Sequence, residues 1–95
     1  MSVYFMASIR IHDPGEYQKY LDHAGEVFAP YKGEYLAVDK APEVLEGKWD
    51  YGRAVLIRFD TKEDFETWYR SDAYQEILKY RSAAADCDTI LIQGD

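Results

Sequence analysis

The side chain of this sequence that is best suited to chemistry is the guanidinium of Arg81, because it interrupts an apolar pattern. In the stretch "SDAYQEILKYRSAAA" (71–85), Arg81 shares one helical face with Tyr74, Ile77 and Leu78. A guanidinium stays charged and must therefore reach water or an acceptor. We interpret Arg81 as an anchor for a substrate carboxylate or enolate, held by two parallel hydrogen bonds. A structural pair with a protein carboxylate is the alternative.

Glu46 and His23 are the candidates for proton transfer beside Arg81. Glu46 lies in the triplet "LEG", and burial would raise the pKa of its carboxyl group enough for a general base. Glu46 is equally suited to pair with Arg81, in which case neither side chain is free for a substrate. His23 borders the apolar face of a predicted helix, where a neutral imidazole can move protons near pH 7. A histidine in that position more often packs its ring and keeps its nitrogens in water.

An aromatic cluster is predicted on the inner faces of the two helical regions. Its members are Tyr17, Tyr20, Trp68, Tyr69 and Tyr74. Most of them suit a tyrosine-rich core, and Trp68 and Tyr74 suit the wall of a pocket for a small unsaturated acid. Tyr20 and Ser71 are further candidates for contact with that acid. Ser71 has no neighbouring His–Asp arrangement, so a helix cap suits it better than a nucleophile.

Residues that would hold a metal or a cofactor are scarce in this sequence. One cysteine and two histidines, without a suitably spaced carboxylate, give no metal triad. Haem would need an axial ligand, and His23 alone is arguable for that role. There is no glycine-rich phosphate loop and no dinucleotide fingerprint. We therefore expect neither a metal nor a cofactor.

Composition and charge restrict the partners. The chain has 95 residues, enough for one domain over residues 1–95, and 47% of them are hydrophobic, which indicates a globular protein. The 11 basic residues are scattered among 18 acidic ones for a net charge of −7, so we expect neither nucleic acid nor an anionic membrane as a partner. The apolar run "VYFMASI" is too short to span a membrane, and we expect a cytoplasmic protein.

Hydrophobic periodicity and capping signals define the order of the elements. Alternation predicts a strand over 3–11, and "DPGE" then begins a helix that should run to about Tyr31. Further strands are predicted over 34–40, 51–60 and 88–94. A second helical region follows the cap at Thr61, and a second cap at Ser71 or Asp72 predicts a break near residue 71. The connector "APEVLEGKWD" is long for a hairpin, and such loops often carry function.

The order β-α-β-β-α-β predicts a ferredoxin-like α+β fold. Right-handed crossovers place both helical regions on one face of a four-stranded antiparallel sheet. A sheet with one solvated face should alternate between apolar and polar residues, whereas "AVLI" and "ILI" are apolar on both faces. A second copy of the chain is the simplest cover for the open face. We therefore predict a homodimer with two sheets packed face to face, a dimeric α/β barrel.

Several motifs resemble one family. "VLEG" (44–47), "RAVLIRF" (53–59), then Trp68, Ser71, Tyr74 and Arg81 in that order resemble domain of unknown function family 1330. The resemblance extends from Tyr4 to Gly94 and implies a dimeric α/β barrel without a settled activity. Related barrels include cofactor-independent monooxygenases, muconolactone-isomerase-like proteins, haem enzymes and stress-responsive proteins, which is an analogy of fold alone. Lys32-Gly33 and Gln93-Gly94 depart from the Gly-Gly and Glu-Gly that are usual in the family.

Two functions of different classes follow from these residues. The first is the binding, and in its fuller form the cofactor-independent conversion, of a small organic acid. Arg81 would hold the anion, Trp68 and Tyr74 would line the cavity, and Glu46 or His23 would move a proton. The second is a non-catalytic dimeric structural or stress-related module with no dedicated ligand. A pocket that contains an unpaired Arg81 favours the first function, and an Arg81–Glu46 pair sealed from solvent favours the second.

Overall fold

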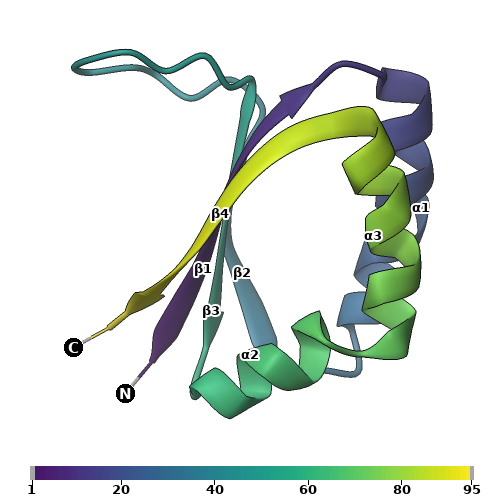
Figure 1. The fold of residues 1–95 in the computed structure, drawn as a ribbon. Coiled ribbons are helices and arrows are strands. Elements are labelled where there is room, and N and C mark those ends of the chain that lie inside the picture. The colour runs from purple at the N-terminus through teal and green to yellow at the C-terminus, as the bar shows by residue number, and fades with distance from the viewer. Residues whose placement is uncertain (1, 95) are drawn as a thin grey trace.

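Four antiparallel strands form one sheet, and three helices lie on one of its faces in the described part of the chain (Figure 1). A computed structural model describes residues 2–94. Its elements are β1 (Val3–Ile11), α1 (Pro14–Phe28), β2 (Gly33–Asp39), β3 (Arg53–Phe59), α2 (Lys62–Tyr69), α3 (Asp72–Ala84) and β4 (Ala85–Gln93). The strand order β2-β3-β1-β4 is that of a ferredoxin-like α+β fold, which confirms the predicted fold class.

Side-chain caps begin each helix where the sequence predicts one. The Asp13 carboxylate accepts a hydrogen bond from the amide of Glu16 at 3.2 Å, and Pro14 occupies the first turn of α1. The Thr61 hydroxyl caps α2 through the amide of Asp64 at 3.0 Å. The predicted break near residue 71 is confirmed, because α2 ends at Tyr69 and α3 begins at Asp72.

Two element boundaries differ by three residues from the sequence prediction, and the ends of the other strands agree to within one or two residues. Helix α1 ends at Phe28, before the predicted Tyr31, and Ala29 forms its C-cap with a hydrogen bond to the carbonyl oxygen of Gly25. Pro30 follows and has no N–H group to continue the helical hydrogen bonds. Strand β4 begins at Ala85 and not at residue 88, because the chain changes from helix to extended backbone at Ala85 without a connecting loop. β4 is consequently longer than predicted and pairs with β1 along its whole length.

The helix-covered face of the sheet carries the core. Val3, Phe5, Ala7 and Ile9 alternate along β1 and are buried under the helices. Trp68 of α2 is buried among the rings of these elements, with Phe5, Phe59 and Phe28 at centroid distances of 5.7, 5.6 and 5.5 Å. Packing of this kind fixes the distance between α2 and the sheet.

Helices α1 and α3 pack against each other and stand off from the strands that they face (Figure 1). The aromatic side chains between these helices and the sheet are large, and they do not fill the whole of the intervening space. The candidate functional site lies in that space.

The open face of the sheet exposes aliphatic side chains. Ile90 and Ile92 on β4 keep 56% and 41% of their surface exposed, and Leu36 at the bulge in β2 keeps 45%. The connector between β2 and β3 projects beyond this face, on the side away from the helices (Figure 1). Beneath the connector, Trp49 borders a hollow over Met6 of β1. The open face is therefore neither polar nor fully covered.

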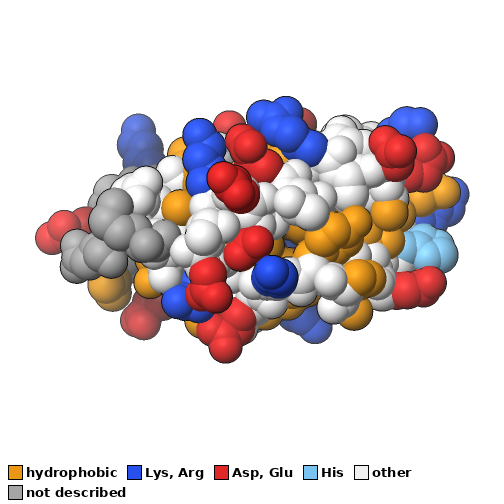
Figure 2. Space-filling view, turned by 90° about the horizontal axis from the view of Figure 1, so that it is seen from below, with side chains coloured by type: hydrophobic (Ala, Val, Ile, Leu, Met, Phe, Trp, Pro, Cys, Tyr) orange, Lys and Arg blue, Asp and Glu red, His pale blue; other side chains and the backbone are white. Residues whose placement is uncertain are grey.

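Charges on the surface are mixed in sign. On the side drawn in Figure 2, acidic and basic side chains are interspersed and no broad basic area forms. A nucleic-acid backbone would need clustered lysine and arginine, which that side does not offer. Within residues 2–94, no helix is both long enough and apolar enough to cross a membrane.

The two ends of the described chain lie next to each other. β1 and β4 are neighbours, and the amide of Gly94 donates a hydrogen bond of 2.7 Å to the carbonyl oxygen of Ser2. A Cβ atom at Gly94 would lie 2.8 Å from that carbonyl oxygen, so the close approach requires glycine.

Candidate anion-binding cavity

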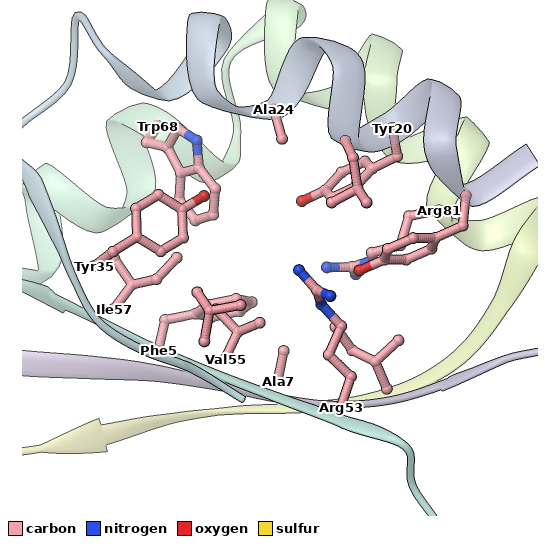
Figure 3. A pocket seen from close by; sticks show the side chains of 14 residues that line it. Phe5, Ala7, Tyr20, Ala24, Tyr35, Arg53, Val55, Ile57, Trp68 and Arg81 are labelled. Carbon is pink, nitrogen blue, oxygen red and sulfur yellow. The ribbon is translucent and has the colours of Figure 1, made fainter. Parts of the chain in front are cut away.

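A cavity of about 60 Å³ lies between the sheet and helices α1 and α3 (Figure 3). Its walls are mainly apolar and come from every layer of the fold. They include Phe5 and Ala7 of β1, Tyr35 of β2, Arg53, Val55 and Ile57 of β3, Tyr20 and Ala24 of α1, Trp68 of α2 and Arg81 of α3. Tyr35 is 43% exposed, so the cavity opens to solvent along β2, an edge strand of the sheet.

Arg81 is buried at the cavity wall without a carboxylate partner. Only 7% of its surface is exposed, and no carboxylate of residues 2–94 forms an ion pair with it. Its Nη1 atom donates to the hydroxyl oxygen of Tyr74 at 3.2 Å, and its Nε atom has no hydrogen-bond partner within the described chain. Burial of an unpaired charge is costly, so a negatively charged partner at this position would stabilise the fold.

Arg53 is a second guanidinium in the same cavity, and the sequence analysis did not single it out. Its side chain leaves β3 on the helix-covered face, and Figure 3 shows its guanidinium pointing into the space that Arg81 borders. The central carbon of this guanidinium lies 5.8 Å from the centroid of the Tyr17 ring. Its Nε atom is buried without a hydrogen-bond partner, and no ion pair of Arg53 forms within residues 2–94.

The sequence did contain a signal for Arg53. In "RAVLIRF", every second residue from Arg53 through Val55 and Ile57 to Phe59 lies on one face of the strand. Ile57 and Phe59 are buried under the helices, so Arg53 begins the same inward row. An arginine in phase with a core-facing row is as unusual as the arginine in the helical stripe of α3.

Tyrosine hydroxyls complete the polar part of the wall. The hydroxyls of Tyr20 and Tyr74 are 2.9 Å apart, and Figure 3 shows those of Tyr20 and Tyr35 directed into the cavity. Burial raises the pKa of Tyr17 to about 12, and burial also raises the pKa values of Tyr20 and Tyr74 above the usual range for tyrosine. All of these hydroxyls therefore keep their protons at neutral pH and can donate hydrogen bonds.

The predicted aromatic residues lie together, with different contacts to the cavity. Trp68 and Tyr20 line it directly. Tyr74 supports both, because its ring lies 4.3 Å from that of Trp68 and its hydroxyl bonds to Tyr20 and Arg81. The Ser71 hydroxyl accepts from the amide of Tyr74 at 3.1 Å and donates to the carbonyl oxygen of Trp68 at 2.7 Å. Ser71 is thus used as the cap of α3.

The structure does not bring Glu46 and His23 to the cavity. Glu46 is exposed in the connector and borders the hollow on the open face, on the opposite side of the sheet from Arg81. The Arg81–Glu46 pair that the sequence left open does not form. His23 is exposed on α1 and is not among the lining residues. Neither position follows from the sequence alone, because both depend on how a loop and a helix are oriented.

Cysteine and acidic side chains add no metal site within the described chain. Among residues 2–94, no group of three histidine, cysteine or acidic side chains is close enough to hold a metal ion. Cys87 is a free, half-buried thiol whose pKa is raised by burial. The groups able to hold a ligand in the cavity are therefore the hydrogen-bond donors described above.

The fold and the cavity define a ferredoxin-like α+β domain with an arginine-bearing cleft under its helices. The chain belongs to the family described as Domain of unknown function (DUF1330), whose model matches residues 2–95. No curated protein matches the sequence.

Solved structures share the fold at low sequence identity. A protein of unknown function from Rhodopseudomonas palustris is 20% identical with a TM-score of 0.79, over 99% of this chain and 82% of that one. SnoaB, a cofactor-independent oxygenase from Streptomyces nogalater, is 14% identical with a TM-score of 0.71, over 99% and 93%. A dimeric ferredoxin-like protein of unknown function from Thermobifida fusca is 17% identical with a TM-score of 0.73, over 99% and 92%.

Proposed function

We propose that this protein binds a small organic acid in the cavity, with Arg53 and Arg81 as its anchors. The observation that carries the proposal is the pair of guanidiniums that border one cavity without a carboxylate from residues 2–94. A purely structural module would be expected to neutralise a buried arginine internally, because an uncompensated buried charge destabilises the fold. The alternative function therefore has less support.

The cavity is better equipped for binding than for proton abstraction. Within residues 2–94, no histidine, aspartate or glutamate lines it. Its tyrosines hold their protons firmly, so none of them is a base at neutral pH. Guanidiniums and hydroxyls can stabilise negative charge that a substrate already carries. Cofactor-independent conversion, the activity given for SnoaB, would require a substrate that reaches the cavity as a stable anion.

A second copy of the chain is our proposal for the cover of the open face. Exposed Ile90 and Ile92 on β4 and Leu36 on β2 give this face an apolar character that solvent does not favour. Two solved structures of the same fold, from Thermobifida fusca and Jannaschia, are described as dimeric ferredoxin-like proteins. Light scattering should give the mass of a dimer for the wild type and of a monomer for Ile90→Asp. A monomeric wild type at micromolar concentration would contradict this.

A thermal-shift panel of small carboxylic acids tests the binding function. An acid present at about 100 times its dissociation constant stabilises the folded state by roughly 2.7 kcal/mol. That is a rise in Tm of several degrees for a domain of this size. Arg81→Met should abolish the rise. Arg10→Met, which removes an arginine from the open face, should preserve it.

The panel also has an outcome that rejects the proposal. If no acid stabilises the wild type and Arg81→Met alone melts far lower, Arg81 is a structural residue. The cavity would then be a packing defect beside a polar network, and the second function would be favoured.

A further inference from the structure

We infer that the acid carries two negative charges that lie close together, as in a compact dicarboxylate, with one charge facing each arginine. This inference rests on the proposed function and makes its ligand class specific. Arg53 comes from β3 and Arg81 from α3, so two independent elements each contribute one positive charge to the same cavity.

Among the arginines of residues 2–94, the missing counter-charge is confined to the two that border this cavity. Arg10 pairs with Asp50 at 2.6 Å, and Arg58, on the same strand as Arg53, pairs with Asp60 at 2.9 Å. Both are partly exposed, where an ion pair contributes little. Arg81 is buried and Arg53 is half-buried, but both have buried Nε atoms and neither has such a partner within residues 2–94. The arginines for which neutralisation matters most are therefore those that lack it.

Electrostatics favours two charges on the ligand over one. Two like charges in a partly buried site repel each other, because the effective dielectric constant is well below that of water. One carboxylate would leave a net positive charge in the cavity, whereas two would neutralise it. Figure 3 shows both guanidiniums at the same end of the cavity, opposite Trp68, so the two acid groups of the ligand must also be close together.

Hydrogen bonding leads to the same class of ligand. Donors predominate among the polar groups of the cavity wall, because the two guanidiniums can only donate and the tyrosine hydroxyls, which also accept, keep their protons. A single carboxylate accepts about four hydrogen bonds, which is fewer than two guanidiniums alone can donate. A ligand with four carboxylate oxygens matches this excess, and a ligand with donors of its own would leave some of them unsatisfied.

The apolar part of the wall favours a carbon skeleton over an inorganic dianion. Phe5, Val55 and Ile57 face the cavity beside the arginines, and such surfaces bind carbon better than phosphate or sulfate oxygens. A cavity of about 60 Å³ has the space of roughly four to six water molecules. This size suits short diacids, and a longer acid would extend through the opening beside Tyr35.

Isothermal titration calorimetry with matched pairs of acids tests this inference. Oxalate, malonate and succinate are each compared with their monoamides, which have nearly the same size and one charge fewer. For the preferred skeleton, the diacid should bind about tenfold tighter than the monoamide, or more. Inorganic phosphate and sulfate should bind more weakly than that diacid.

Two variants test whether Arg53 binds the second carboxylate of the ligand. Arg53→Met should weaken the binding of the diacid and reduce the ratio of its affinity to that of the monoamide to about twofold or less. Arg58→Met, which changes the same strand on the opposite face, should leave both affinities unchanged. Circular dichroism verifies that each variant is folded, and the comparison of acids on the wild type needs no variant at all.

The outcomes separate this inference from the proposed function. Equal affinity for a diacid and its monoamide, or an unchanged preference in Arg53→Met, overturns the inference while acid binding stands. Tighter binding of phosphate or sulfate than of any diacid overturns it in favour of an inorganic anion. If neither these acids nor any acid of the thermal-shift panel binds, the inference and the proposed function fail together.

Discussion

Arg10 and Arg53 lie on neighbouring strands and have opposite surroundings. Ile9 is the register partner of Arg53, so Arg10 is only one residue further along β1 and points to the other face. On the open face, Arg10 contacts Asp50 at 2.6 Å and Asp86 at 3.6 Å, and it lies over the Tyr51 ring at 4.8 Å. Under the helices, Arg53 has the Tyr17 ring and no carboxylate of the described chain.

This difference shows that the positive cavity does not result from a shortage of acid groups. The sequence has 18 acidic residues and 11 basic ones, so carboxylates are abundant. Those of the described chain lie on or next to the helices and strands and in the connector, and all of them are exposed or half-buried, where solvation makes pairing least necessary. On the helix-covered face, Arg53 and Arg81 have no ion pair within residues 2–94 and the tyrosines keep their protons, which is the arrangement on which the proposed acid binding rests.

The largest expected effect contrasts the tryptophans of the two faces. Trp68→Ala should lower the free energy of unfolding by about 3–5 kcal/mol, because a large side chain that is only 2% exposed leaves a cavity in the aromatic core. Trp49→Ala, at a half-buried position of the exposed connector, should cost clearly less. Urea denaturation of both variants measures the difference. Equal losses would mean that the connector belongs to the core.

Replacing an arginine should have opposite effects on the free energy of unfolding on the two faces of the sheet. Arg81→Met should stabilise the ligand-free protein by about 1–4 kcal/mol, because it replaces an uncompensated buried charge by an apolar chain of similar length. Arg10→Met should be neutral or destabilising by at most about 1 kcal/mol, because it removes an exposed pair. Chemical denaturation without added acids measures the free energy of unfolding of both variants. A strong destabilisation by Arg81→Met would assign that residue a structural role.

The tyrosines that bond to charged groups should follow the same division. Tyr74→Phe should lower the free energy of unfolding by about 1–3 kcal/mol, because Arg81 and Tyr20 both lose a buried hydrogen-bond partner. Tyr51→Phe removes an exposed hydrogen bond to Asp88 and should change the free energy of unfolding by about 0.5 kcal/mol or less. Comparable losses in the two variants would contradict the distinction between the faces.

The smallest effect should appear only in alkaline solution. The pKa of Tyr17 rises from about 10 when unfolded to about 12 when folded, so the unfolded chain releases this proton first. The contribution of Tyr17 to the free energy of unfolding is therefore fully present below pH 10 and is lost as the pH rises from 10 to 12. Tyr17→Phe should make this decline shallower in thermal unfolding measured at pH 9, 10 and 11. An unchanged slope would show that Tyr17 does not contribute to it.

Much of the fold could be predicted because its signals are local. The caps at Asp13, Thr61 and Ser71 are short-range patterns, and alternation along β1 identifies its buried row. The start of β4 at Ala85 could not be predicted, because the residues before it favour a helix and no turn residue marks the change. Tertiary pairing with β1 determines that boundary.

The candidate site could be predicted only in part, because it is assembled from distant elements. Arg81 and Trp68 followed from helical periodicity, and Arg53 was missed although its strand alternates in the same way. Glu46 and His23 were selected by residue type. The structure places them on an exposed connector and an exposed helix face, and periodicity cannot determine the direction of a loop.

The hydrogen bond between Gly94 and Ser2 has a consequence for the order of the chain itself. Because β4 returns to lie beside β1, a short linker could join residues 94 and 2 while new ends are opened within the connector 40–52. Such a circular permutant would keep every strand pair of the sheet and both arginines of the cavity. What folding requires here is the set of neighbouring elements, and the connector is the place where the chain can be cut without separating them.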